Sequence, residues 1–380
     1  MKKNICTVLS MCLMLTLFSG CVPSSGGGQA PAGNSTGQNE GGGTSENGGE
    51  NTTPVSGTPL KVGLMPSAVG APVQYALEQG YFEEEGVNIQ TVIFPSGAPI
   101  NEAVAAKELD VAMSGAATVF SLASGNVKLL GDIAGSGGMG IWVRADSDIM
   151  NAQGEAADAK DMYGSAETIK GKTFICALGT ASQFNVLRYI SQYGLTDADV
   201  NIVHMEFGAG AQAFNAGEGD AIATFAPYSA QVEAEGAVKC CTFEDATQTA
   251  LYDMMFARNE VIENRRDDLV KYVRAVERAI EDLSDHDTRT EFSMRWFADE
   301  GREYDEATME QEIADRPYVN KALMTVGSYV FGDAMIGYGE FNVEIGKIEP
   351  EGIENIKNCF DDTILEEAVG ITVKDPVSST

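Results

Sequence analysis

The sequence has 380 residues, 44% of them apolar, and its 25 basic and 56 acidic side chains give a formal charge of −31. A chain of this length exceeds one ordinary core, so we expect two domains of about 100–200 residues each beside any tails. Nucleic-acid binding and polybasic membrane binding both need clustered Lys and Arg, so this charge argues against both. The acidic surface itself indicates solubility through mutual repulsion.

The N-terminus has the pattern of a secretory lipoprotein signal. A short basic start precedes a mostly apolar run over 5–18, and this run is shorter than the roughly 20 residues that a membrane-spanning helix needs. Small residues then precede Cys21, so the segment resembles a bacterial lipobox, in which that thiol accepts a diacylglyceryl group. Phe18 stands where an aliphatic residue is usual, and ordinary secretory cleavage is the alternative. We expect a signal peptide over 1–20 and an extracytoplasmic protein anchored to the cell membrane.

Residues 21–58 are predicted to form a flexible tether. They are rich in Gly, Ser, Asn and Thr, with Gly triplets at 26–28 and 41–43. Such a composition buries too little apolar surface to offset the entropy of ordering. A coil of this length reaches roughly 35 Å root-mean-square, so it would hold a globular body near the membrane while leaving it free to rotate.

Metal binding and catalysis find little support in the residue types. The seven cysteines form no C-x-x-C pair, and His204 and His286 stand alone, so we expect no zinc site and no cofactor. The nucleophile elbow, the zinc-protease helix and the phosphate-binding loop are missing from the sequence, and two histidines offer little for acid–base catalysis. We therefore predict that the protein is not an enzyme. Whether any of the four cysteines after position 60 form a disulfide is left open.

From Leu60 onward, strand and helix patterns alternate, which predicts α/β layers with mainly parallel sheets. The first lobe is expected to contain strands over 60–65, 87–94, 110–113, 127–134 and 140–146 and helices over 71–82, 100–107 and 116–124. The second lobe is expected to contain strands over 171–178, 201–207, 220–225 and 238–243 and helices over 179–195, 211–219 and 227–236. Two successive sheets of this size suggest two lobes with a cleft between them.

After Tyr252 the pattern becomes helical. One apolar stripe runs along 267–283, at Leu269, Val273, Val276, Ile280 and Leu283, and it predicts an amphipathic helix that packs on a core. Further helices are expected over 288–300, 305–315 and 350–360. We expect this tail to return to the first lobe, so that the two chain segments that cross between the lobes form a hinge. The predicted domains are lobe 1 over 59–150, lobe 2 over 151–250, and the return with C-terminal helices over 251–380.

Several segments carry a family pattern. The helix that ends in G-Y-F is followed by E-E-E-G-V, and a G-x5-A-x4-E-L-D-V element begins at Gly97. In the second lobe, 171–200 begins G-K and continues through G-T to G-L, and 214–231 contains A-G-E-x-D-A followed by Pro. These segments resemble the solute-binding lipoproteins of ABC transporters for nitrate, sulfonates, taurine and thiamine-pyrimidine precursors, over about 60–250. The resemblance implies a type II periplasmic-binding fold with its ligand in the interlobe cleft.

Five loops at the carboxyl ends of the predicted strands form the expected ligand site. Ligands of open α/β sheets lie outside these strand ends, and helix N-termini there offer unpaired N–H groups. Small residues allow the backbone to approach a ligand, and hydroxyls donate or accept hydrogen bonds. The candidate ligand-binding residues in these loops are Pro66, Ser67, Ser96, Gly97, Ser114, Gly115, Ala116, Thr118, Gly179, Thr180, Ser182, Thr224, Phe225 and Pro227. Helix capping explains any single Ser or Thr equally well.

Two further residues are candidates outside these loops. Trp142 could form an aromatic wall of the cleft or part of the core, and Gln74 could reach the cleft from the first helix or lie on the surface. Arg144 and Arg188 are the nearest cations, and neither is assigned to the site. Without an obvious cleft arginine, a singly charged or neutral polar ligand is favoured over a doubly charged anion.

These patterns predict the extracytoplasmic solute-binding component of an ABC importer. It would act as a monomer, capture a small organic solute of the sulfonate, taurine, nitrate or pyrimidine class by hinge closure, and deliver it to a membrane permease. One alternative is an enzyme on the same fold, of the pyrimidine-precursor or menaquinone-pathway type. Another is a surface interaction lipoprotein. The generic donors in the loops do not name the solute.

Overall fold

The computed structural model describes residues 57–156, 159–248, 252–326, 329–332 and 334–377. The predicted signal peptide, the lipidation residue Cys21 and nearly all of the predicted tether lie outside these ranges. Among the helices within them, none combines the length and the apolar character that crossing a membrane requires.

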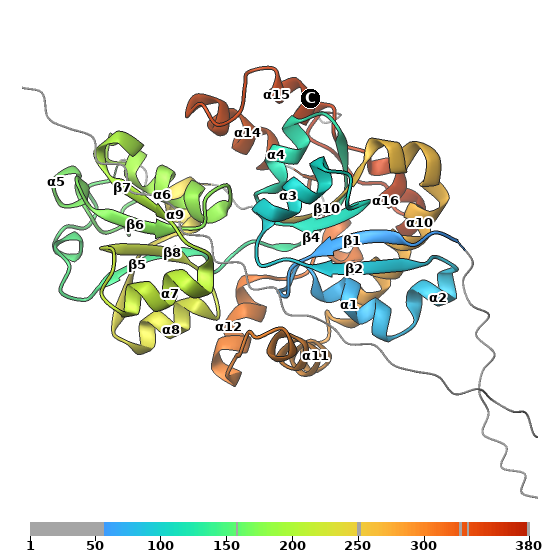
Figure 1. Ribbon diagram of the computed structural model, residues 1–380, viewed down its shortest axis with the longest axis horizontal. Coiled ribbons are helices and arrows are strands. Elements are labelled where there is room, and N and C mark those ends of the chain that lie inside the picture. Colours follow the sequence, from blue (N-terminus) through green and yellow to red (C-terminus); the bar gives the residue numbers. More distant parts are fainter. Residues whose placement is uncertain (1–56, 157–158, 249–251, 327–328, 333, 378–380) are drawn as a thin grey trace, which may run out of the picture. The chain divides into compact units, whose positions relative to one another are not determined.

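Two five-stranded sheets organise the described chain (Figure 1). The first has the order β2-β1-β3-β10-β4 and consists of β1 (Leu60–Leu64), β2 (Ile89–Ile93), β3 (Val111–Ser114), β4 (Val127–Gly135) and β10 (Tyr252–Arg258). The second has the order β7-β6-β8-β5-β9 and consists of β5 (Gly140–Arg144), β6 (Thr173–Cys176), β7 (Asn201–His204), β8 (Ala221–Thr224) and β9 (Ala237–Thr242). The predicted α/β class is confirmed.

In each sheet four strands run in one direction and one strand runs against them, so the prediction of mainly parallel sheets is confirmed, and one antiparallel strand is added to each. In the first sheet β1 is parallel to β2 and β3, but β10 is antiparallel to β3 and β4. In the second sheet β6 is parallel to β7 and β8, but β5 is antiparallel to β8 and β9. The antiparallel strand of the first sheet, β10, follows all strands of the second sheet in sequence, whereas the antiparallel strand β5 directly precedes the other strands of its sheet.

Two strand assignments differ from the prediction. The strand predicted over 140–146 is β5, and it belongs to the second sheet rather than the first. The segment after Tyr252 begins with β10 rather than a helix, and its central five residues are buried. A strand buried on both faces shows no alternation of polar and apolar residues, which is why the pattern did not predict it. The chain therefore passes between the sheets after β4 and again after β9, and we propose that the lobe boundaries follow these crossings.

The helices before β10 connect the strands. They are α1 (Ala71–Glu78), α2 (Tyr81–Glu85), α3 (Gly97–Ala105), α4 (Thr118–Ala123), α5 (Ala166–Ile169), α6 (Ala181–Ser191), α7 (Phe207–Asn215), α8 (Tyr228–Ala234) and α9 (Phe243–Thr247). Short 3-10 turns occupy Asp148–Asn151 and Asp197–Asp199.

The C-terminal helices return to the first sheet, as predicted. They are α10 (Asn259–Asp282), α11 (His286–Asp299), α12 (Glu306–Asp315), α13 (Lys321–Met324), α14 (Ala334–Glu344), α15 (Gly352–Lys357) and α16 (Asp362–Val369). The predicted apolar stripe of α10 is buried, and this helix packs against α1, α2 and α16. Helix α14 also contacts α6, because the ring centroids of Phe184 and Tyr338 lie 4.2 Å apart.

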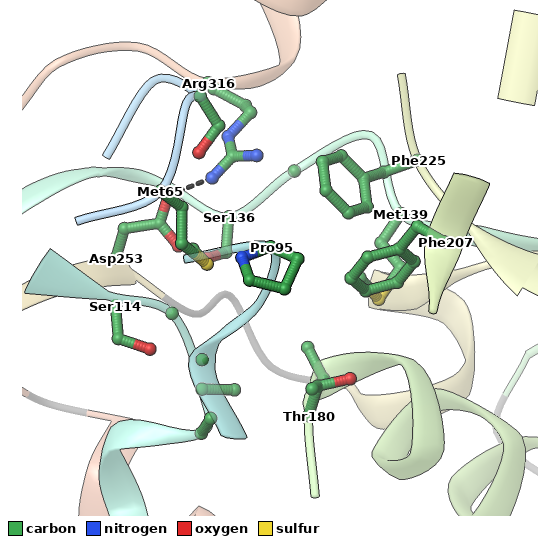
Figure 2. A pocket seen from close by; sticks show the side chains of 17 residues that line it. Met65, Pro95, Ser114, Ser136, Met139, Thr180, Phe207, Phe225, Asp253 and Arg316 are labelled. Carbon is green, nitrogen blue, oxygen red and sulfur yellow. Dashed lines mark hydrogen bonds and ion pairs between the residues drawn. The ribbon is translucent and has the colours of Figure 1, made fainter. Parts of the chain in front are cut away.

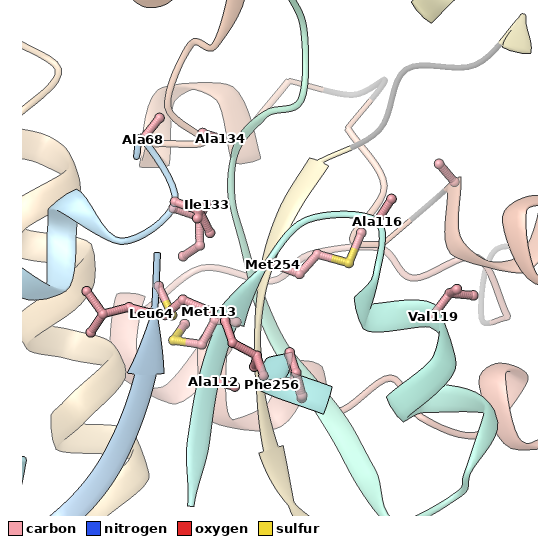
Figure 3. Close-up of a cluster of buried hydrophobic side chains, with 14 of the residues drawn as sticks. Leu64, Ala68, Ala112, Met113, Ala116, Val119, Ile133, Ala134, Met254 and Phe256 are labelled. Carbon is pink, nitrogen blue, oxygen red and sulfur yellow. The ribbon is translucent and has the colours of Figure 1, made fainter. Parts of the chain in front are cut away.

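The core of the first sheet is built by neighbouring strands (Figure 3). Leu64 of β1, Met113 of β3 and Phe256 of β10 are all fully buried, and each such side chain contributes about 1.5–3 kcal/mol to folding. A smaller cluster under the second sheet contains Trp142, whose indole Nε1 donates to Glu233 at 2.7 Å. Trp142 is thus a core residue, the alternative that the sequence left open.

Candidate functional site

One pocket, which we call the inner pocket, is lined by loops from both sheets (Figure 2). Its lining includes the ends of β1, β2, β3 and β4 in the first sheet, the start of α6 and α7 and the end of β8 in the second, and a residue after α12. The strand ends that meet here are the carboxyl ends of the parallel strands, where α/β sheets place ligands. The seventeen lining residues are Met65, Ser67, Pro95, Gly97, Ser114, Gly115, Ala116, Ala117, Ser136, Gly137, Met139, Thr180, Ala181, Phe207, Phe225, Asp253 and Arg316.

Seven of the sequence-predicted candidates lie in this lining, namely Ser67, Gly97, Ser114, Gly115, Ala116, Thr180 and Phe225. They come from all five predicted loops, three in the first sheet and two in the second. Gly97 is required sterically, since a Cβ at this position would lie 2.3 Å from the Oγ of Ser114. The loops thus approach one another closely enough to form a shared wall.

Several predicted hydroxyls have structural partners. Thr180 is the N-cap of α6, where its Oγ1 accepts from the backbone N–H of Ser182 at 3.2 Å and donates to the carbonyl of Ala177 at 2.7 Å. The hydroxyl of Ser182 donates to the carbonyl of Ala223 at 2.7 Å. Thr118 donates to the carbonyl of Ser114 at 3.4 Å. For these residues helix capping and loop bracing account for the hydroxyl, although Thr180 also faces the inner pocket.

The other predicted candidates lie apart from the inner pocket. Gln74 pairs with Glu78, and the backbone N–H of Gly179 donates to Gln183. Pro66 lines a neighbouring cavity, and the hydroxyl of Ser96 donates to Glu206. Thr224 is buried in β8, and Trp142 lies in the core. Pro227 follows a cis peptide bond.

The sequence did not point to the most strongly charged feature of the lining. The guanidinium of Arg316 forms a buried ion pair with Asp253, and Ser136 donates to the other oxygen of that carboxylate at 2.6 Å. Burial alone would lower the pKa of Arg316, but Asp253 and Glu312 outweigh burial and raise it. An arginine therefore does line the pocket, contrary to the expectation from sequence.

Arg144 and Arg188, the nearest cations in sequence, lie elsewhere. Arg144 donates to the backbone carbonyls of Phe214 and Gly219, and Arg188 lies over the ring of Phe341 at 5.1 Å.

The polar part of the inner pocket contains unused hydrogen-bonding groups. The hydroxyls of Ser67 and Ser114 and the Nε of Arg316 are all buried and have no hydrogen-bond partner among the described residues. Buried polar atoms are nearly always paired with a hydrogen-bond partner, so each unpaired atom here requires an explanation such as a bound group.

The inner pocket is small, with a cavity volume of about 60 Å³. Sites for drug-sized ligands have volumes of roughly 300–1,000 Å³, so this pocket suits a head group of a few atoms.

The apolar part of the inner pocket is aromatic. Phe207 and Phe225 pack edge to face with ring centroids 4.8 Å apart, and Figure 2 shows them on the side of Pro95 opposite Asp253 and Ser114. The pocket therefore offers donors on one side and an apolar wall on the other.

The cysteines are unsuited to nucleophilic chemistry. Cys176, Cys240, Cys241 and Cys359 are buried and form no disulfide with one another, and burial raises the pKa of Cys176, Cys240 and Cys359 to about 12. A thiol with so high a pKa carries almost no thiolate at neutral pH. Within the described ranges, no three His, Cys, Asp or Glu side chains gather as a metal site.

Comparisons with known proteins agree with this geometry. A model of the NMT1-like family matches residues 54–295. A Brachyspira hyodysenteriae protein, named as an ABC transporter periplasmic binding protein, is 35% identical over 264 residues, which are 69% of this chain and 76% of that protein.

Solved structures share the fold at low identity. The alkanesulfonate-binding protein from Xanthomonas axonopodis pv. citri bound to MOPS matches with a TM-score of 0.61 and 16% identity, over 80% of this chain and 98% of that one. The periplasmic nitrate-binding protein from Synechocystis PCC 6803 matches with a TM-score of 0.66 and 11% identity, over 82% and 88%.

Proposed function

The chain belongs to the NMT1-like family, as the resemblance over 60–250 predicted, and on this premise we propose that it is the extracytoplasmic solute-binding component of an ABC importer. The Brachyspira relative is named as an ABC transporter periplasmic binding protein. The observation that supports the proposal most is the inner pocket itself, because loops of both sheets contribute to one cavity. We propose that the protein binds its solute without transforming it.

We propose that the unpaired groups of the inner pocket bind the head group of the solute. Ser67 and Ser114 would donate their hydroxyl protons, and Arg316 its Nε proton, to oxygen atoms of the solute. The charge of Arg316 is already balanced by Asp253, which favours a singly charged or neutral polar head group over a doubly charged one. Sulfonate, nitrate and carboxylate groups all meet this description, and the sulfonate- and nitrate-binding structures share the fold.

Closure follows from contacts to both sheets. A solute that touches Ser67 on one side and Phe225 on the other favours the arrangement in which these loops are close. The loops already meet at one point beside the pocket, where the hydroxyl of Ser96 donates to Glu206 at 3.4 Å. Solute would add to this contact and shift the population toward the closed form.

The place of action follows from the N-terminal pattern. We propose that Cys21 carries a lipid anchor, that the tether over 21–58 lets a monomeric body move near the membrane, and that a permease there receives the solute. Replacement of Cys21 by Ser should abolish incorporation of labelled palmitate and release the protein from the membrane fraction. Labelling that persists in the variant would contradict the anchor.

A thermal-melting screen tests solute binding. Sulfonates, nitrate, taurine, short carboxylates and pyrimidines are added in turn, and a solute present at 100 times its Kd should stabilise the folded state by about 2.7 kcal/mol. The absence of any shift across this panel would contradict the proposed function. Product formation by the purified protein would favour an enzyme on the same fold, and saturable binding to a protein without solute dependence would favour an interaction lipoprotein.

A further inference from the structure

A second cavity adjoins the inner pocket. Its volume is about 280 Å³, and it shares Pro95 and Phe207 with the inner pocket. Its lining comes from the ends of β1 and β2, the start of α7 at 206–208, Tyr228 at the start of α8, and the turn after α11 at 300–302. We call this cavity the outer subsite.

Two opposite charges with unused atoms face the outer subsite. Arg302 is 5% exposed. Its Nη2 donates to the carbonyl of Pro95 at 3.3 Å, but its buried Nη1 has no hydrogen-bond partner within the described part of the chain. Glu206 accepts from Ser96 through Oε1, but none of the described residues donates a hydrogen bond to its buried Oε2. No ion pair within 4.0 Å joins the two side chains. A buried charge left partly unpaired is costly, so this arrangement calls for a group that bridges both.

The walls of the outer subsite are flat. The rings of Phe207 and Tyr228 are nearly parallel, with an interplanar angle of 14° and centroids 6.2 Å apart. The guanidinium of Arg302 lies over the ring of Tyr228 at 5.7 Å. Aromatic faces of this kind favour planar groups that can stack on them.

We propose that the outer subsite binds a planar amide-type group, such as a carboxamide or ureide, carried by the same solute whose head group occupies the inner pocket. Its N–H donates to Oε2 of Glu206, and its carbonyl oxygen accepts from Nη1 of Arg302. An ammonium group would satisfy Glu206 alone, and a carboxylate would satisfy Arg302 while facing the charge of Glu206. A neutral group with adjacent donor and acceptor satisfies both.

The inference rests on the proposed function and specifies its substrate class. The solute is bifunctional, with an oxygen-rich head for Ser67 and Ser114 and an amide-type tail for Glu206 and Arg302. Pro95 and Phe207, which line both cavities, would contact the short apolar link between the two ends.

Two pairs of probes of matched shape isolate the tail. 3-Sulfopropionamide is compared with 3-methylbutane-1-sulfonate, and succinamate with 4-methylpentanoate, so that each pair keeps its head and exchanges a carboxamide for an isopropyl group. Isothermal titration of the wild-type protein should show that the amide member binds at least about tenfold more tightly, since hydrogen bonds to charged groups contribute about 1.5–3 kcal/mol each.

Three variants test which residues cause the preference for the amide member of each pair. Glu206→Met, at a half-buried position, and Arg302→Lys, which keeps the charge but offers a different donor geometry, should each reduce the amide preference severalfold. Ser67→Ala is the matched control: it should weaken both members of a pair equally and leave their ratio unchanged. Melting of the unliganded variants separates this effect from a loss of folding.

The outcomes distinguish the outer subsite from the proposed function. If the probes bind without an amide preference, or the preference survives in both Glu206→Met and Arg302→Lys, the outer subsite is wrong and solute binding stands. In a further outcome, the probes fail to bind while another compound of the wider panel binds. If that compound lacks an amide-type group, the outer subsite is wrong. If it carries an amide-type group and Glu206→Met weakens its binding, the outer subsite is supported. If no compound binds, both proposals fail.

Discussion

Arg316 and Asp253 form a buried ion pair in the lining of the inner pocket although 63 positions separate them in sequence. Asp253 lies near the start of β10, and Arg316 follows α12. The pair therefore joins the segment after α12 to β10, which lies beside the end of β3 that carries Ser114. Glu312, 3.8 Å from the guanidinium, adds a second carboxylate, and burial raises the pKa of Glu312 while Arg316 opposes this rise.

Asp253→Asn should expose the role of this ion pair. Removing one partner of a buried pair leaves an uncompensated charge, so we expect a loss of about 3–5 kcal/mol in unfolding free energy by urea denaturation. Anionic solutes should bind more tightly to the variant, because Arg316 would no longer be neutralised by Asp253. Glu354→Gln, which removes an exposed pair with Lys357, is the control and should change stability by less than about 1 kcal/mol. Equal stability of the two variants would contradict this account.

The hydroxyls divide into two groups with opposite expected effects. The hydroxyls of Ser67 and Ser114 form no hydrogen bond to any residue that the structure describes, so Ser67→Ala and Ser114→Ala should weaken solute binding about tenfold each without lowering the melting temperature. Thr180 caps α6, so Thr180→Ala should cost about 1 kcal/mol of stability. Titration and melting of the three variants check both effects. Lowered melting temperatures in the Ser67 and Ser114 variants, with unchanged affinity, would assign these hydroxyls to folding.

Gly97→Ala tests the close approach of two loops. A Cβ there would lie 2.3 Å from the Oγ of Ser114 and 2.8 Å from the Cβ of Ala117, so the pocket wall must move. We expect lower stability and loss of solute binding. Gly337→Ala in α14 is the control, because its Cβ would meet nothing within 4 Å, and stability should rise by up to about 1 kcal/mol. Normal solute binding by Gly97→Ala would show that the wall is not needed.

Glu277 in α10 should make stability depend on pH. It is buried, and neither carboxyl oxygen has a hydrogen-bond partner in the described ranges. Burial, with Glu281 and Asp132, raises its pKa well above the usual value. The folded state thus holds a proton that the unfolded state releases at about pH 4.3, and the stabilisation present below that pH is lost as pH rises toward the folded pKa. Glu277→Gln should therefore gain stability over the wild type at pH 8 and lose this advantage at pH 4.

Unfolding free energies measured by urea denaturation from pH 4 to pH 8 check this prediction. Glu349→Gln, at an exposed position, is the control and should follow the wild-type curve. A constant difference between Glu277→Gln and the wild type over the whole range would contradict the assignment.

The sequence was sufficient for much of the fold because most strands and helices have local signals. The stripe of α10 and the loops at Ser67 and Ser114 could be located without coordinates. By contrast, β10 is buried on both faces, so its sequence shows no alternation of polar and apolar residues. It also pairs with β3 and β4, which precede it by more than a hundred residues, so the adjacent sequence does not indicate a strand. Arg316 is in the inner pocket only because the C-terminal segment returns there, a contact that no local pattern encodes.

Hydrogen–deuterium exchange with and without a solute from the melting screen tests the central claim most directly. A solute held between loops of both sheets should slow exchange of the backbone amides around 65–70 and 114–118 in the first sheet and around 180–184 and 225–228 in the second. Protection confined to one of the two sheets, or no protection with a solute that raises the melting temperature, would contradict capture in the inner pocket.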